Sequence, residues 1–133
     1  MVKVLAKRRE GYTHDVEIEG GHSLVIDEPV ADGGANAGPS PTRTLAAALA
    51  ACTAITAEMY AGRKGWELGE LEVEVEIAYD GAAPTAFDVT LRCPGELDEE
   101  QMQRLLKIAA KCPVHRLLSH ETTVTVTDHI VRC

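Results

Sequence analysis

The segment SPTRTLAAALAACTAITAEMYAGRK, Ser40–Lys64, decides the fold because it predicts one long uninterrupted helix. Ser40 followed by Pro41 is typical of a helix start, since proline gives up only an amide that would be unbonded in the first turn. Gly62 and the two cations after it favour a helix C-terminus. With a rise of about 1.5 Å per residue, a helix of about 22 residues is about 33 Å long.

This helix is apolar nearly all round. One face, at 4-3-4-3 spacing, comprises Leu45, Leu49, Cys52, Thr56 and Met59, and alanines fill most of the other positions. Such a pattern predicts a long buried central helix. Its length also suits a membrane span, but the alanine content, the threonines and Glu58 argue against one. The single thiol of the helix, Cys52, lies near its middle, which is where we first look for function.

The composition indicates a soluble globular protein that forms a single domain over residues 1–133. Hydrophobic residues make up 45% of the chain and charged residues 26%. The net charge of −8 argues against nucleic acid or an anionic membrane as partner, because both need a cationic face. The chain leads from Met1 straight into charged sequence, with no signal peptide, so we expect a cytoplasmic protein.

The four cysteines, at positions 52, 93, 112 and 133, are widely spaced and lack a Cys-x-x-Cys pair. Structural zinc sites usually show such pairs, so we expect no metal and no cofactor. In a reducing cytoplasm, a disulfide would be catalytic or redox-sensing and not structural. Cys93 ends a predicted strand, which favours a passive edge residue, and Cys133 is the last residue.

Before the helix, three short β-branched segments predict an antiparallel meander: Val2–Lys7, Thr13–Glu19 and Ser23–Asp27. The glycine-rich segment from Pro29 to Pro39 lacks the Gly-Lys-Ser/Thr ending of a phosphate-binding loop. We therefore interpret it as a connector that delivers the chain into the helix.

After the helix, alternating apolar residues predict two paired strands, Leu71–Asp80 and Phe87–Arg92. The acids of the first strand could mark a cation site, but the alternation favours a solvated face. Asp98 and Gln101 form a capping-box pattern for the next helix, whose predicted apolar face comprises Met102, Leu105, Leu106 and Ala109.

A short helical turn from Cys112 and a last strand, Thr122–Thr127, complete the predicted order βββ-α-ββ-αα-β. Because helices and strands do not alternate regularly, this order is typical of an α+β fold, with antiparallel sheets around the central helix.

Cys112 precedes Pro113, which predicts a helix N-cap position for the thiol. The free amides and the helix dipole there favour a thiolate, as do the neighbouring cations, so a redox thiol is one interpretation. A packed cysteine that only caps the turn is another, and a metal site shared with His115 is a third. Cys52 differs, because burial should raise its pKa and leave it inert unless Cys112 and an arginine come within reach.

Several motifs together resemble the OsmC/Ohr family, the osmotically inducible and organic-hydroperoxide-resistance proteins, and specifically its OsmC-like branch. They are Asp27-Glu28-Pro29, Gly33-Gly34, Gly38-Pro39-Ser40-Pro41, the run Leu45–Thr53, and Cys112-Pro113-Val114-His115. The resemblance implies an intertwined homodimer with active sites at the subunit interface. It also implies a thiol-dependent peroxidase, in which Cys52 attacks an organic hydroperoxide and Cys112 then forms a disulfide with it. A dithiol reductant would restore both thiols.

The peroxidases of this family also use an arginine from the N-terminal hairpin, held by a glutamate just after the proline that starts the helix. Arg9 matches that arginine, with Arg8 second. Here Thr42-Arg43 stands where the glutamate is expected, so Arg43 is either a substitute for holding the thiolate or a surface residue. The departure leaves open a non-enzymatic dimer on the same fold, which would sense redox state or bind a lipophilic ligand.

Overall fold

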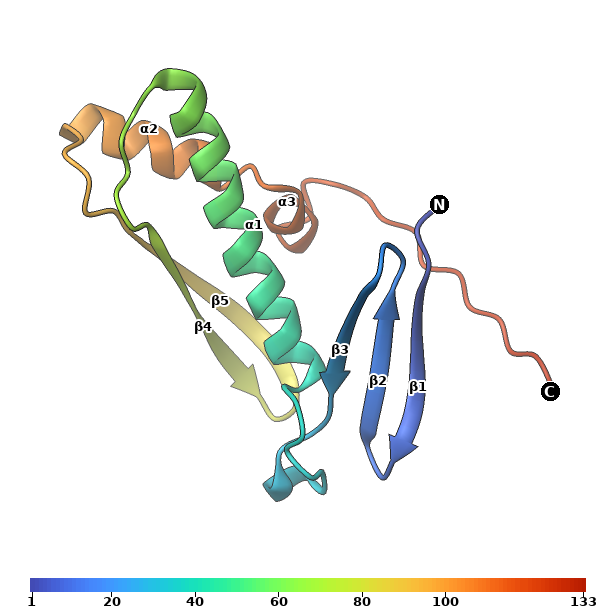
Figure 1. Ribbon diagram of the computed structural model, residues 1–133. Helices are drawn as coiled ribbons and strands as arrows, with labels where there is room; N and C mark the ends of the chain where they lie inside the picture. The colour runs from blue at the N-terminus through green and yellow to red at the C-terminus, as the bar shows by residue number, and fades with distance from the viewer. The chain divides into compact units, whose positions relative to one another are not determined.

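The computed structural model describes residues 1–133, and its elements follow the predicted order up to the last strand (Figure 1). These elements are β1 (Val4–Glu10), β2 (Thr13–Ile18), β3 (His22–Ile26), η1 (Val30–Asp32), α1 (Pro41–Lys64), β4 (Glu72–Asp80), β5 (Ala83–Arg92), α2 (Glu99–Ala109) and α3 (Pro113–Leu118). The α+β prediction is therefore confirmed. β5 begins at Ala83, four residues before the predicted Phe87.

The chain divides into two compact units, each of which is discontinuous in sequence. The first comprises Met1–Ala48 and Val75–Asp88, and we call it the sheet unit. The second comprises Leu49–Glu74 and Val89–Cys133, and we call it the thiol unit because it contains every cysteine. Both α1 and the β4–β5 hairpin continue from one unit into the other.

In the sheet unit, β1, β2 and β3 form the predicted antiparallel meander (Figure 1). Val16 on the central strand pairs with Ala6 on one side and Leu24 on the other, and it is buried. Every residue of β1 is exposed. The register of β1 against β2 shifts between Arg8 and Glu10, which is the irregularity of a β-bulge.

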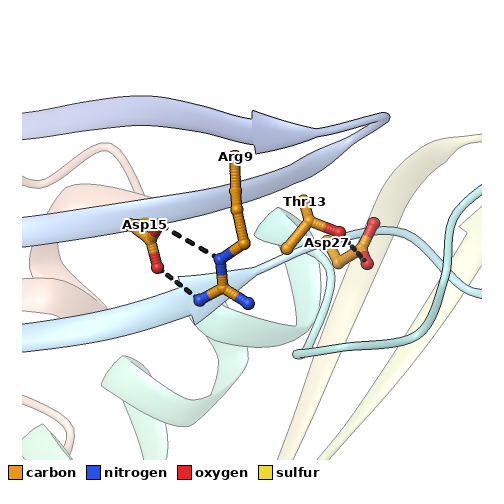
Figure 2. A network of polar contacts seen from close by, with 4 residues as sticks. All are labelled: Arg9, Thr13, Asp15 and Asp27. Atoms are coloured by element: carbon orange, nitrogen blue, oxygen red, sulfur yellow. Dashed lines mark hydrogen bonds and ion pairs between the residues drawn. The ribbon is translucent and has the colours of Figure 1, made fainter.

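A buried carboxylate organises the connector between β3 and α1. Asp27 is 1% exposed and accepts hydrogen bonds from the Thr13 hydroxyl (2.7 Å; Figure 2) and the backbone amides of Glu28, Ala35 and Ala37. The Thr13 hydrogen bond, followed by those amides, outweighs burial and lowers the pKa of Asp27. The connector therefore closes around a charge that stays ionised.

Two glycines let this connector pack tightly. A Cβ atom at Gly34 would lie 2.0 Å from the Glu28 carbonyl oxygen, and one at Gly38 would lie 2.1 Å from the Val25 carbonyl oxygen. Neither backbone oxygen can move aside without breaking the turn, so only glycine fits. The connector prediction is confirmed, and its glycines are explained by close backbone approach.

Helix α1 begins where the sequence predicts, with the Arg43 amide donating to the Ser40 hydroxyl oxygen at 3.3 Å. Its buried residues are Ala46, Leu49, Thr53, Ala57 and Ala61. The buried face lies about one residue further along the helix than the predicted face. Cys52 and Thr56, which belong to the predicted face, are only half-buried.

The prediction of a helix buried nearly all round is wrong for the single chain, because Ile55 is 52% and Met59 61% exposed. The side that packs carries small residues, which allow neighbouring elements to approach closely, and the bulky Ile55 and Met59 lie on the other side. By length and composition α1 is also long and apolar enough to cross a membrane, with 28% of its most apolar window buried.

The core of the thiol unit is built on the end of α1 and on α2, with Ala57, Ala61, Leu68, Leu105 and Ala109 buried together. The predicted capping box is confirmed, since the Asp98 side chain accepts from the Gln101 amide and the Gln101 side chain accepts from the Asp98 amide. The predicted apolar face of α2 is only half buried, because Met102 and Leu106 are 38% and 49% exposed.

The acidic residues of β4 lie on a solvated face, as the alternation predicts. Glu72, Glu74 and Glu76 are exposed, and Arg92 from β5 forms ion pairs with Glu74 at 2.9 Å and Glu72 at 3.9 Å.

The predicted last strand, Thr122–Thr127, is wrong for the single chain, which has no helix or strand after Leu118. A strand is defined by its ladder with a neighbour, and this segment finds none within its own chain. Its apolar side chains are exposed, Val124 by 56% and Val126 by 79%.

Candidate functional site

Cys112 occupies the N-cap of α3, so this prediction is confirmed. Its backbone is extended, with φ −63° and ψ 150°, and Pro113 forms the first helical residue. The Cys112 sulfur accepts a hydrogen bond from the His115 backbone amide at 3.3 Å. The thiol is fully buried, with an exposed fraction of 0%. The sulfur therefore caps an amide that would otherwise lack a partner.

A threonine of α1 makes the second contact of this buried thiol. The Thr53 hydroxyl oxygen lies 3.8 Å from the Cys112 sulfur, within the range of a weak sulfur hydrogen bond. Thr53 is itself only 2% exposed, and its hydroxyl donates to the Leu49 carbonyl at 2.8 Å. Thr53 thus links Cys112 to α1 at the residue next to Cys52.

Cys52 is half-buried and interacts directly with Cys112. Its sulfur also accepts hydrogen bonds from the Val114 backbone amide and from the Thr56 hydroxyl. The first free amides of α3 are therefore divided between the two thiols, Val114 serving Cys52 and His115 serving Cys112. The structure thus brings together two cysteines that are 60 positions apart in the sequence.

Opposing effects act on the ionisation of Cys52. Burial is the largest and raises the pKa of the Cys52 thiol above its ordinary value, and the hydrogen bond and charge of Cys112 raise it further. The hydrogen bonds from Val114 and Thr56 favour the thiolate and lower it, but the net shift is upward. No cation is among the groups that shift this pKa, so the contacts of Cys52 do not favour a thiolate at neutral pH.

Sequence analysis missed Thr53, Thr56 and the Val114 amide. A signal was present, since Thr53 and Thr56 are polar residues in an otherwise alanine-rich helix, directly beside Cys52. A further polar group of this region is the buried His115 Nδ1, which has no hydrogen-bond partner.

Arg9 and Arg8, the two candidates on the hairpin, play different parts in the sheet unit. Arg9 lies within the register shift of β1 and forms a forked ion pair with Asp15 of β2, at 2.5 Å and 3.2 Å (Figure 2). Arg8 instead donates to the Gly11 carbonyl at 2.9 Å and closes the turn. The Arg9 hydrogen bond lowers the pKa of Asp15, and both side chains remain about half exposed.

At the start of α1, Thr42 and Arg43 help to line an open cleft of about 590 Å³ within the sheet unit. The Thr42 hydroxyl is hydrogen-bonded to the Tyr79 hydroxyl at 2.9 Å. The Arg43 side chain forms no ion pair. The acid that holds a hairpin arginine in this chain is therefore Asp15 on β2, and not a residue of the helix start.

A second hollow in the sheet unit, of about 520 Å³, is mostly apolar. Its lining includes Ala6, Tyr12, His14, Val16 and Ile26. The chain has no group of three His, Cys, Asp or Glu side chains that could hold a metal ion.

A family model described as OsmC-like protein matches residues 33–127. Among solved structures, the chain resembles the OsmC-like protein from Mycoplasma pneumoniae, with 17% identity, a TM-score of 0.78, and 90% of this chain and 87% of that one covered. It also resembles the organic hydroperoxide resistance protein OhrB of Bacillus subtilis, with 28% identity, a TM-score of 0.60, and 88% and 89% covered. Comparison with curated proteins gives no match.

A pH titration of Cys52 checks the contacts assigned to its sulfur. We expect Thr56→Val to raise the pKa of Cys52, because it removes a hydrogen bond to the thiolate. We expect Cys112→Ala to lower it, because it removes a neighbour that opposes the charge. The measurement is the rate of Cys52 alkylation by iodoacetamide across the neutral and alkaline range, followed by mass spectrometry, with Cys93 as the internal control. Shifts in the same direction for both variants would contradict the assignment.

Proposed function

The chain belongs to the OsmC-like protein family, and within it we propose that this protein is a peroxidase that reduces organic hydroperoxides with Cys52 and Cys112. The observation that carries the proposal is the direct interaction of these two thiols at the start of α3. The similarity to a hydroperoxide resistance protein at 28% identity supports the choice of substrate.

The first step takes place at Cys52, the more accessible of the two sulfurs. The Cys52 thiolate attacks the terminal oxygen of the hydroperoxide, so that an S–O bond forms and the O–O bond breaks. The alkoxide leaves and takes up a proton to become the alcohol, and Cys52 becomes a sulfenic acid. The sulfur is oxidised by two electrons and the peroxide is reduced by two.

The second step uses Cys112. Its sulfur attacks the Cys52 sulfur, an S–S bond forms, and the S–O bond breaks. The departing hydroxide takes the Cys112 proton and leaves as water. A dithiol reductant then exchanges with the disulfide and restores both thiols. We also propose that the protein works in the cytoplasm, where such a reductant is maintained.

Thiol counting tests this scheme. One equivalent of cumene hydroperoxide should remove two of the four thiols of the reduced protein, without loss of protein. Cys52→Ser should abolish peroxide consumption, whereas Cys112→Ser should consume one equivalent and stop at the sulfenic acid. The matched control is the Cys93→Ser, Cys133→Ser double variant, which should behave as the unmodified chain does. Peroxide consumption that survives Cys52→Ser would overturn the proposal.

Arg9 and Arg43 are the two candidates for the cation that activates Cys52. We favour Arg9, because Asp15 already fixes its guanidinium, whereas the Arg43 side chain is unrestrained by any ion pair. We expect Arg9→Ala to slow the reaction with hydroperoxide at neutral pH by about tenfold or more, since a positioned charge stabilises the thiolate and the leaving oxygen. Arg43→Ala is the matched control, and stopped-flow peroxide consumption is the measurement. A larger loss for Arg43→Ala would reverse the assignment.

We also propose that the protein is an intertwined homodimer. Three features of the single chain support this: the exposed Ile55 and Met59 of α1, the exposed strand β1, and the segment after Leu118 with its exposed Val124 and Val126. Sedimentation equilibrium should give twice the chain mass of 14.3 kDa, and removal of residues 122–133 should weaken the dimer. A monomer at micromolar concentration would contradict the proposal.

The alternative is a dimer that binds a lipophilic ligand without turnover. The apolar hollow on the meander, with Val16 and Ile26 in its lining, favours this candidate. It differs from the peroxidase in two measurable respects. A lipophilic ligand would still bind to the Cys52→Ser variant, and the thiol count of the unmodified chain would stay at four after peroxide.

A further inference from the structure

We propose that Thr53 is a positioning residue for the second oxidation step, in which it holds the Cys112 thiol seated beside Cys52 until the sulfenic acid has formed. This inference rests on the proposed peroxidase function and assigns a role to a residue outside the reacting pair. It begins from the geometry of a buried hydroxyl and a buried thiol, which are 2% and 0% exposed.

The direction of the hydrogen bond between them follows from counting protons. The Thr53 hydroxyl has one proton, and it is donated to the Leu49 carbonyl at 2.8 Å. Towards the Cys112 sulfur, 3.8 Å away, the Thr53 oxygen can therefore only accept. The S–H of Cys112 points at Thr53, while the sulfur itself accepts from the His115 amide at 3.3 Å.

Cys112 is thus satisfied both as donor and as acceptor without contact with water. Both partners belong to helices, Thr53 to α1 and His115 to α3, so they fix the rotamer of the thiol between two rigid elements. The sulfur is thereby held at a position next to Cys52. Such prior orientation is what accelerates an intramolecular attack.

A second threonine one turn along α1 serves the other sulfur. The Thr56 hydroxyl donates to Cys52, the thiol that meets peroxide. The two threonines therefore have separate tasks, Thr56 in the first step and Thr53 in the second. This division provides a matched pair of variants in the same helix.

The test measures the two steps separately in the full chain, with Cys93 and Cys133 replaced by serine throughout. After cumene hydroperoxide is added, the sulfenic acid is trapped with dimedone at timed intervals and the disulfide is counted by mass spectrometry. We expect Thr53→Val to leave the first step at its normal rate and to slow disulfide formation by about twofold, the factor expected at the weak end of the hydrogen-bond range. More Cys52 should then reach the sulfinic acid in excess peroxide.

Two variants complete the comparison. Thr53→Ser keeps the hydroxyl and should restore the rate of disulfide formation. Thr56→Val should show the reverse pattern, with a slower first step and a normal second step. Equal slowing of both steps by Thr53→Val would indicate a merely structural role and overturn the inference, as would an unchanged second step.

An infrared measurement tests the hydrogen bond itself, without peroxide. In a chain whose only cysteine is Cys112, the S–H stretching band should lie below that of a free thiol, and Thr53→Val should move it up. If Thr53→Val does not fold, the S–H band of the single-cysteine chain that keeps Thr53 is still a test. A band at the frequency of a free thiol would overturn the inference. A chain that forms no sulfenic acid at all would instead overturn the proposed peroxidase function, while the band still reports on Thr53.

Discussion

The thiol site depends on the small size of the side chains on the packed face of α1. Within the thiol unit this face consists of Leu49, Thr53, Ala57 and Ala61, all at most 2% exposed. Because the alanines project so little, α2 can bury Leu105 and Ala109 against the end of the helix. The one polar residue of the face, Thr53, is tolerated since its hydroxyl bonds to the Leu49 carbonyl, and it makes contact with Cys112. The same packing that stabilises the unit therefore fixes the position of the second thiol.

The two thiols of the site have different environments. Cys112 is fully buried, and its sulfur contacts an amide and a hydroxyl. Cys52 is half-buried and receives two hydrogen bonds, from Val114 and Thr56, both of which lower its pKa. Burial nevertheless raises the pKa of Cys52, so the thiol unit alone does not make a reactive thiolate. The proposed chemistry therefore needs a cation that the contacts of Cys52 do not supply.

The sequence was sufficient to predict most of the local structure. The caps of α1, α2 and α3 depend only on neighbouring residues, so Ser40, Asp98 and Cys112 could be assigned from sequence, and the structure confirms them. Strand alternation was equally informative for the meander and for the acidic face of β4. What these features share is that their physical cause lies within a few residues along the chain.

The features that sequence could not provide depend on contacts between distant segments. The buried face of α1 was predicted about one position away from the observed one, because alanines occupy so many positions of the helix that they do not distinguish its faces. The pairing of Arg9 with Asp15 joins two strands at a point where their register shifts, and no residue pattern signals that shift.

The segment Thr122–Thr127 has the composition of a strand, yet a strand exists only when another backbone completes its hydrogen bonds. The exposed face of α1 has the same property, since Ile55 and Met59 are apolar and uncovered in one chain. Local sequence therefore specifies surfaces that a single chain leaves unpaired, and a second copy of the chain is the simplest partner that would satisfy both at once. On that view, the failures of the strand and burial predictions have one cause. Both predictions would be met in the proposed dimer, through contacts that one chain leaves unmade.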